Sequence, residues 1–330
     1  GYNYSGQQGA PARSCSDEEK QQIGISEEDA RKYVDDFVQK TGMDWKIHDT
    51  LCIRGFTVRE NEDTYGYILE PDIRTLTKEP EANYSKEIVF GEFHNKTKNY
   101  FSGPKSELPE ESGGWCDYMV ELEFFKSMPE GIRKDAWFLT KVTMTGQERN
   151  PETGRYPLLN WDDPATNQKH PYWKKNIESS DWVFNYDDGY YETKGISSAS
   201  GKTRMIFRYA DILLLYAEAV AYGTKSIDDL AFDCMWRVQE RAGVPLISKD
   251  VTKEYFQKAV LDERRWETAG MEHSCMGRFF TMQRHEILHL QKNYRDAAEL
   301  SLNPNLTLSE EFYYFPIPDN ELLIVPGLKD

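Results

Sequence analysis

Hydrophobic and polar positions follow the clearest helical pattern between residues 208 and 243, where two consecutive helices are predicted. Gly223 separates them, and the second helix starts at Ser226 with Asp229 and closes at Arg241-Ala242-Gly243. Small side chains stand among large apolar ones in the first helix, so a neighbouring helix can approach closely. The pattern predicts a tetratricopeptide-type helical hairpin that serves as a scaffold. The small residues are Ala210, Ala217, Ala219 and Ala221, and the large ones are Leu213, Leu214, Tyr216 and Val220.

Helices are also predicted on both sides of this hairpin. Ser26 and Asp29 form a capping-box pattern before the apolar stripe of residues 27–40, and Gly42 ends that helix. Beyond the hairpin, helical spacing recurs at Phe256, Ala259, Val260, Glu263 and Trp266.

Short strands and long loops are predicted between the helical parts. Residues 87–93 and 136–145 favour strands, whereas 102–114 and 150–201 are rich in turn-forming residues and lack sustained periodicity. We therefore expect a mainly α fold with three regions. These are a partial N-terminal helical and loop region (1–83), a loop-rich region with short strands and aromatic loops (84–201) and a C-terminal helical region (202–330).

Composition restricts the class of partner. With 330 residues and 39% hydrophobic content, the chain can bury a substantial core. Its formal net charge of -16 opposes binding to the phosphate backbone of nucleic acids, so nucleic acid is not an expected partner. The cysteines form no CxxC pair, which argues against a zinc ribbon. They are Cys15, Cys52, Cys116, Cys234 and Cys275.

Several blocks of residues resemble, in order, the motifs of the SusD/RagB family. Residues 85–90 are similar to its S-x-E-I-I-F strand, and Gly131-Ile132-Arg133 lies where a D-x-R triplet is usual. Residues 208–219 resemble its R-Y-A-D-I-L-L-L-Y-A-E-A segment, Arg241-Ala242-Gly243 follows the same helix-pair pattern, and residues 263–267 resemble its E-R-R-x-E helix. Residues 315–322 resemble the closing P-I-P-x-x-E-L. This resemblance covers roughly residues 84–330.

The resemblance implies a SusD-like tetratricopeptide-type helical scaffold and a non-catalytic role without a cofactor. Family members are lipoproteins on the extracellular face of the outer membrane that capture nutrients for a SusC-like TonB-dependent transporter. The expected ligand is an oligosaccharide or an oligopeptide. Because family members are usually longer, we expect this chain to be the C-terminal portion of such a lipoprotein, with the N-terminal part and its lipid anchor outside it.

An aromatic-rich stretch supplies candidate ligand-binding residues. Sugar rings present C–H faces that stack on indole and phenol planes, and neighbouring polar side chains bind the hydroxyls. Trp161 and Trp173, which have polar neighbours, are expected to be the most exposed. The predicted ligand-binding residues are Trp161, Tyr172, Trp173, Trp182, Tyr186 and Tyr190.

One motif suggests a different function. Residues 285–289 read H-E-I-L-H, and on a helix the imidazoles of His285 and His289 share a face where they can hold zinc. Glu286 would then act as general base on a bound water, as in a metallopeptidase. However, Arg284 directly before the motif would repel a dication, and no Gly-x-x-His continuation follows His289. Zinc catalysis therefore stands as the alternative, and the preferred interpretation has no metal site.

Overall fold

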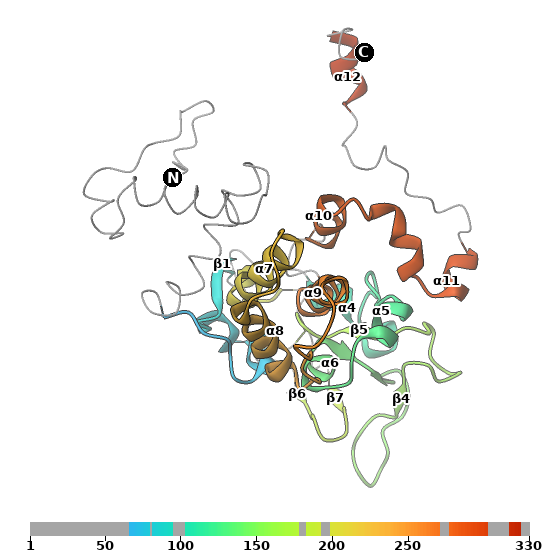
Figure 1. Cartoon of the computed structure of the whole chain (residues 1–330). Coiled ribbons are helices and arrows are strands. Elements are labelled where there is room, and N and C mark those ends of the chain that lie inside the picture. The colour runs from blue at the N-terminus through green and yellow to red at the C-terminus, as the bar shows by residue number, and fades with distance from the viewer. Residues whose placement is uncertain are drawn as a thin grey trace.

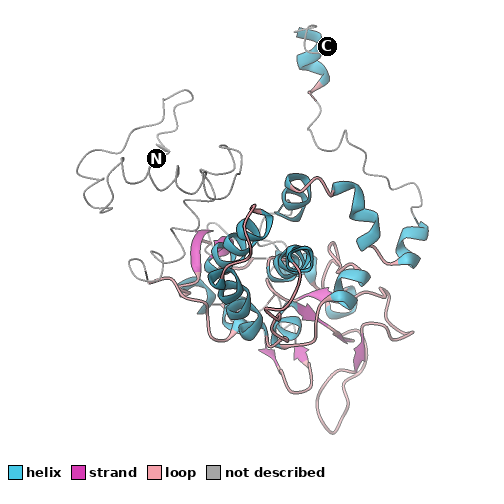
Figure 2. Ribbon diagram, viewed as in Figure 1, coloured by secondary structure: helices cyan, strands magenta, loops and turns pink. Residues whose placement is uncertain are grey.

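The structure is a computed structural model that describes residues 66–79, 81–94, 103–177, 183–192, 199–270, 277–302 and 317–324. Helices dominate this part of the chain, and its strands are short (Figure 2). The mainly α fold expected from the sequence is confirmed. The helix predicted for residues 27–40 lies outside the described residues.

Three helices form the centre of the molecule (Figure 1). They are α7 (Tyr209–Tyr222), α8 (Asp229–Ala242) and α9 (Lys253–Glu267), and α7 packs against both of the others. Ala210, Ala217 and Ala221 of α7 are completely buried, so the small residues do lie where the helices approach. Phe256 of α9 fills the same core and meets Phe232 edge to face, with ring centroids 4.9 Å apart. The predicted helical hairpin is confirmed.

The ends of these helices follow local capping chemistry. The Asp228 side chain accepts a hydrogen bond of 2.8 Å from the Ala231 N–H and so begins α8, which makes the predicted start at Ser226 two residues too early. Gly243 ends α8 with φ of 69°, in the left-handed region that glycine adopts most readily. Thr252 caps α9 through the Tyr255 N–H.

A close backbone approach joins α6 (Ile132–Trp137) to the end of α8. A Cβ atom on Gly131 would lie 2.6 Å from the Ala242 carbonyl oxygen, so only glycine fits there without a shift. Gly131 therefore lets the start of α6 pack directly on the hairpin.

One strand pair connects the hairpin to the earlier part of the chain. Strand β1 (Ile88–Glu92) pairs antiparallel with β8 (Arg204–Arg208), and β8 runs directly into α7. The Asp211 carboxylate accepts a 2.8 Å hydrogen bond from the Arg208 N–H at this junction. The strand predicted over 87–93 is confirmed.

The loop-rich region consists of short strand pairs and short helices on one side of the hairpin (Figure 1). The strand predicted over 136–145 starts too early, because α6 extends to Trp137. Its pairs are β2 (Phe138–Leu139) with β5 (Tyr172–Trp173), β3 (Lys141–Thr143) with β4 (Leu158–Asn160), and β6 (Val183–Phe184) with β7 (Tyr191–Glu192). Its helices are α4 (Gly103–Glu107), η3 (Glu110–Ser112), α5 (Leu122–Ser127) and α6, and the short helices η1 (Ile73–Thr77) and η2 (Glu81–Tyr84) precede them in the chain.

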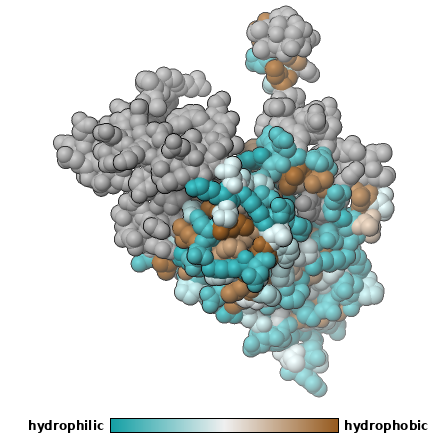
Figure 3. Space-filling view, in the orientation of Figure 1, coloured by the Kyte–Doolittle hydropathy of each residue, from teal (hydrophilic) through white to brown (hydrophobic). Residues whose placement is uncertain are grey.

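Within residues 277–302 and 317–324, four more helices follow α9. They are α10 (Gly277–Arg284), η4 (Leu288–Tyr294), α11 (Ala297–Leu302) and α12 (Asp319–Ile324). The visible described surface is mostly hydrophilic with apolar patches among the polar side chains (Figure 3).

A buried ionic network links the loop-rich region to the hairpin. Arg208 contacts Glu87 at 2.6 Å and Glu267 at 2.8 Å, and these side chains are at most 1% exposed. Arg241 binds the same two carboxylates, at 2.8 and 2.6 Å, and Arg133 reaches Glu267 at 3.2 Å. Burial alone would raise the pKa of Glu267, but the three guanidinium groups outweigh it and hold that pKa well below its ordinary value. With Glu263, which also pairs with Arg133, the network balances three positive against three negative side chains. We call these six residues the buried ionic network.

Candidate functional site

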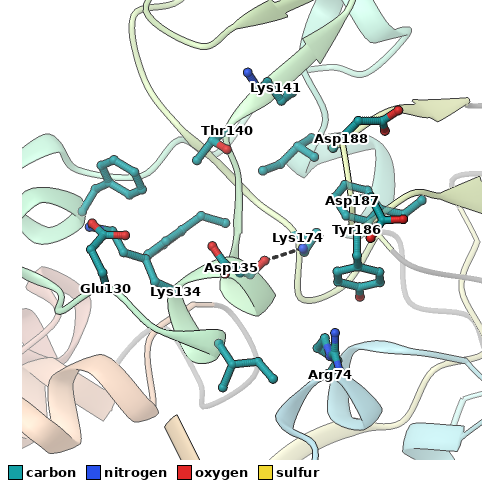
Figure 4. A pocket seen from close by; sticks show the side chains of 16 residues that line it. Arg74, Glu130, Lys134, Asp135, Thr140, Lys141, Lys174, Tyr186, Asp187 and Asp188 are labelled. Carbon is teal, nitrogen blue, oxygen red and sulfur yellow. Dashed lines mark hydrogen bonds and ion pairs between the residues drawn. The ribbon is translucent and has the colours of Figure 1, made fainter. Parts of the chain in front are cut away.

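A cavity of 420 Å³ opens between η1 and two parts of the loop-rich region, the start of α6 and the β6–β7 turn (Figure 4). This volume lies within the range typical of small-molecule sites. Aromatic and charged side chains line it together. They include Arg74, Phe125, Glu130, Lys134, Asp135, Phe138, Lys174, Phe184, Tyr186, Asp187 and Asp188. We call this space the Tyr186 cavity.

Aromatic rings form two parts of the Tyr186 cavity wall. Tyr186 meets Phe184 edge to face with centroids 4.7 Å apart, at the end of β6. Phe125 from α5 packs on Phe138 of β2 at 5.2 Å. Tyr186 and Phe184 are half-buried, so each presents part of its ring to the cavity. Half-buried rings held by aromatic neighbours provide rigid apolar surfaces for a ligand.

Cationic groups surround the Tyr186 ring. The Lys174 ammonium lies 4.6 Å from the ring centroid, and the Arg74 guanidinium carbon lies 5.3 Å from it. Figure 4 shows Lys174 between Tyr186 and Asp135, where its ammonium donates a hydrogen bond to the Asp135 carbonyl oxygen. Lys78 is also within 5.2 Å of the same ring. These contacts fix the ring through cation–π attraction and place hydrogen-bond donors beside it.

Carboxylates supply acceptors around the same space. Asp187 and Asp188 stand on the turn that follows Tyr186, and both are exposed. The Asp188 carboxylate accepts hydrogen bonds of 2.9 Å from the Tyr190 N–H and 2.6 Å from Arg155, and both hold its pKa below the usual value. The Asp187 backbone N–H donates a 2.9 Å hydrogen bond to the Asn185 side-chain oxygen, and Asp187 itself is exposed beside the cavity. An ionised carboxylate next to an aromatic ring can bind the hydroxyl groups of a polyol.

Of the five predicted ligand-binding residues that the structure describes, Tyr186 alone lines the Tyr186 cavity. Tyr190 is 8% exposed and lines a neighbouring space of 350 Å³ with Tyr156, whose N–H donates to the Tyr190 hydroxyl at 3.1 Å. Trp182 lies outside the described residues.

The other predicted aromatic residues support the fold. Tyr172 is completely buried on β5, so its placement at a ligand surface is corrected: its ring is part of an apolar core cluster. Trp173 packs on Phe138 at 5.3 Å, and Trp161 meets Phe125 edge to face at 5.9 Å. Both tryptophans are half-buried rather than exposed, because these aromatic neighbours cover part of each ring. Each therefore backs a residue of the Tyr186 cavity wall.

The geometry required by the zinc hypothesis is not formed. Helix α10 ends at Arg284, and Glu286 adopts φ of 57°, so His285 and His289 do not share one face of a continuous helix. His285 instead lies 2.8 Å from a Glu218 carboxylate oxygen. Within the described ranges, no three His, Cys, Asp or Glu side chains are grouped as metal ligands.

Sequence reasoning missed most of the Tyr186 cavity wall. Arg74, Phe125 and Lys174 come from η1, α5 and the residue after β5, which are up to 100 residues apart in the chain (174 − 74). The aromatic stretch indicated the β6–β7 turn but carried no signal for the partners that fold against it. Among the described residues, no helix is both long and apolar enough to cross a membrane.

Comparison with known proteins shows the family. The sequence profile of the SusD family matches residues 7–330, a longer stretch than the 84–330 expected from the motifs. No curated protein sequence matches the chain.

Solved structures have the same fold. A SusD superfamily protein from Parabacteroides distasonis is 17% identical with a TM-score of 0.59, over 90% of this chain and 60% of its own. A surface glycan-binding protein A from Bacteroides thetaiotaomicron is 16% identical with a TM-score of 0.57, over 94% of this chain and 67% of its own. The same-named protein in complex with laminarihexaose has a TM-score of 0.53 at 16% identity, over 86% and 62%. This chain thus spans about 60% of the length of the first of these structures. From the extent of the profile match and the shared fold, the chain belongs to the SusD family.

Proposed function

We propose that this protein captures an oligosaccharide in the Tyr186 cavity without altering it chemically. The observation that carries the proposal is the arrangement of Tyr186, whose half-buried ring has Lys174 on one side and the exposed carboxylate of Asp187 next to it in sequence. A pyranose stacks its C–H face on such a ring, and the partly exposed Arg74 guanidinium and the Asp187 carboxylate bind its hydroxyls. The described cavity thus offers both kinds of contact that a neutral, hydroxyl-rich ligand needs.

Structural relatives support a glycan as the ligand. One solved structure with this fold holds laminarihexaose, and another with a TM-score of 0.58 holds a xylogluco-oligosaccharide. Both are below 20% identical to this chain, so they support the ligand class and leave the particular sugar to the side chains of the Tyr186 cavity.

Membership of the SusD family supports a partner and a location. We propose that the protein acts on the extracellular face of the outer membrane, held there by a lipid anchor, and passes its ligand to a SusC-like TonB-dependent transporter. Copurification of a large β-barrel protein with this chain from its native membrane tests this part of the proposal. Purification of the chain without such a partner under mild detergent would contradict it.

Replacement of Tyr186 by alanine tests the ligand site. Because an aromatic contact contributes about 0.5–1.5 kcal/mol beyond the area it buries, we expect Tyr186→Ala to weaken oligosaccharide binding by about 10-fold or more. The measurement is isothermal titration calorimetry with laminarihexaose, a xylogluco-oligosaccharide, maltohexaose, xylohexaose and a mixture of oligopeptides. Titration of the wild-type protein shows which of these probes binds, and the variants are then compared with that probe.

Tyr84→Ala is the matched control. Tyr84 is 83% exposed on η2 and does not line the Tyr186 cavity, so its loss is expected to leave affinity unchanged. Equal affinities of the wild type and Tyr186→Ala would exclude this cavity as the site. If the wild type binds oligopeptides but none of the sugars, the ligand class is peptide and the proposed glycan ligand is wrong.

A further inference from the structure

A second group of exposed aromatic residues lies outside the Tyr186 cavity. Trp115, Tyr118 and Met119 have 51%, 45% and 39% of their surfaces exposed, on the segment between η3 and α5. None of them lines the Tyr186 cavity. Large apolar side chains gathered in one exposed segment mark interaction surfaces more often than chance exposure does. We call residues 115–119 the Trp115 platform.

The backbone of the Trp115 platform is held against α4 and the turn that follows it. The Trp115 N–H donates to the Lys105 carbonyl at 2.7 Å, and the Asp117 N–H donates to the Ser106 carbonyl at 2.8 Å. The Cys116 N–H reaches the Leu108 carbonyl at 3.1 Å. Hydrogen bonds at three successive residues hold the backbone of this segment in place, so the positions from which the exposed side chains project are fixed.

Strain at Cys116 accompanies this arrangement. Cys116 adopts φ of 54°, a left-handed conformation that is unfavourable for a non-glycine residue. The preceding Gly114 lies so close to Leu108 that a Cβ would come within 2.1 Å of the Leu108 carbonyl oxygen. The conformation leaves Cys116 half-buried against a core cluster while Trp115 and Asp117 on either side are exposed. Backbone strain of this kind concentrates at functional sites.

The strained residue itself is not the reactive group. Burial, followed by the charges of Glu110 and Glu111, raises the pKa of the Cys116 thiol to about 11, so it is protonated at neutral pH. A protonated thiol is a poor nucleophile and a poor metal ligand. The exposed neighbours of Cys116 are therefore the groups through which this segment can act.

The chemistry of the Trp115 platform suits a sugar. Trp115 and Tyr118 offer aromatic faces, and Asp117 between them is an exposed carboxylate. The Lys105 ammonium lies 5.7 Å from the centroid of the Trp115 ring, which adds a donor beside it. Aromatic faces with a hydrogen-bonding acid and base alongside match the alternation of C–H faces and hydroxyl edges on a pyranose.

We propose that the Trp115 platform is a second glycan-binding site, which engages the same polymer as the Tyr186 cavity. This inference rests on the proposed function. Two linked contacts raise the affinity for a long chain far more than for a short one, because the second contact forms at a high effective concentration. The platform then retains polysaccharides on the protein while the cavity holds an individual stretch of the chain.

Affinity gel electrophoresis tests the Trp115 platform. The probes are laminarin, xyloglucan, starch and xylan cast into native gels, with a plain gel as reference. We expect the double variant Trp115→Ala/Tyr118→Ala to lose at least about 10-fold in affinity for the polymer that retards the wild type. Calorimetry with the corresponding hexasaccharide should show a change below about twofold, because the short ligand occupies the Tyr186 cavity alone.

Two controls separate this inference from the proposed function. Tyr84→Ala should migrate as the wild type does, and circular dichroism checks that the double variant is folded. If Tyr186→Ala loses binding while Trp115→Ala/Tyr118→Ala keeps full polymer affinity, the proposed function stands and the platform is refuted. If the double variant instead binds all glycans normally but no longer copurifies with a membrane protein, the platform is a protein contact and the inference is also wrong. If the wild type migrates in every polymer gel as it does in the plain gel, both the proposed function and the platform inference are wrong.

Discussion

Removal of one charge from the buried ionic network should be among the most damaging single changes in the protein. Glu267 is completely buried and binds Arg208 at 2.8 Å, Arg241 at 2.6 Å and Arg133 at 3.2 Å. Glu267→Gln keeps the shape of the side chain but removes the one carboxylate that pairs with all three guanidinium groups of the network. Breaking a buried ion pair by removing one partner costs about 3–5 kcal/mol. We expect that loss in the free energy of unfolding.

Urea denaturation followed by circular dichroism measures this loss. The control is Glu240→Gln, the same chemical change on an exposed residue of α8, for which we expect a difference within about 0.5 kcal/mol. A loss below about 1 kcal/mol for Glu267→Gln would refute the reasoning, because the uncompensated guanidinium charge would then have little consequence for stability.

The pH dependence of the same pair of proteins gives a second measurement. The folded-state pKa of Glu267 is below its unfolded value of about 4.3, so its contribution is fully present above that pH and is lost as the pH falls toward the folded pKa. The wild type should therefore lose stability between about pH 5 and pH 3 more steeply than Glu267→Gln. A difference between the two proteins that stays constant over this range would contradict the assignment.

Three further predictions concern packing and the alternative function. Gly131→Ala should destabilise the protein by about 1–3 kcal/mol, because its Cβ would lie 2.6 Å from the Ala242 carbonyl oxygen; an unchanged urea midpoint would show that the backbone shifts freely. Phe256→Ala should cost about 3–5 kcal/mol by opening a cavity in the core, and a cost below about 1 kcal/mol would mean that the core collapses around it. Because His285 contacts Glu218, added zinc should neither raise the melting temperature of the protein nor cause it to cleave casein. Zinc-dependent cleavage of casein that Glu286→Gln abolishes would restore the metallopeptidase hypothesis.

The sequence was most informative where structure is local. The small residues of α7 predicted the helical hairpin because helix packing depends on side chains a few positions apart, and Gly243 marked the end of α8. The loop-rich region was predicted less well. The strand predicted over 136–145 included Ala136 and Trp137, yet both belong to α6, whose start packs on the end of α8 where Gly131 allows a close approach. That contact joins residues more than a hundred positions apart and leaves no local pattern.

The candidate site also combines features that a local sequence pattern predicts with features that depend on long-range contacts. Tyr186 was found because aromatic residues cluster along the chain, whereas Tyr172 from the same cluster is buried. Composition does not distinguish a ring that faces a cavity from one that fills a core, since both are large and partly apolar. Trp115 lies outside the aromatic stretch, and the sequence revealed neither its exposure nor the left-handed conformation of the adjacent Cys116.

The buried ionic network also has a consequence for how the protein is made. Glu87 pairs with Arg208, which is 121 residues later in the chain, and with Arg241, which is 154 residues later. Both arginines also bind Glu267, so their set of ion pairs is complete only when Glu267 is present. If a nascent chain has been synthesised only to the end of α8, Arg208 and Arg241 would have to be buried without the Glu267 carboxylate that binds both of them. Biogenesis of this domain is therefore expected to be completed only after α9 has been synthesised, and chains cut short before that point should be substrates for proteases.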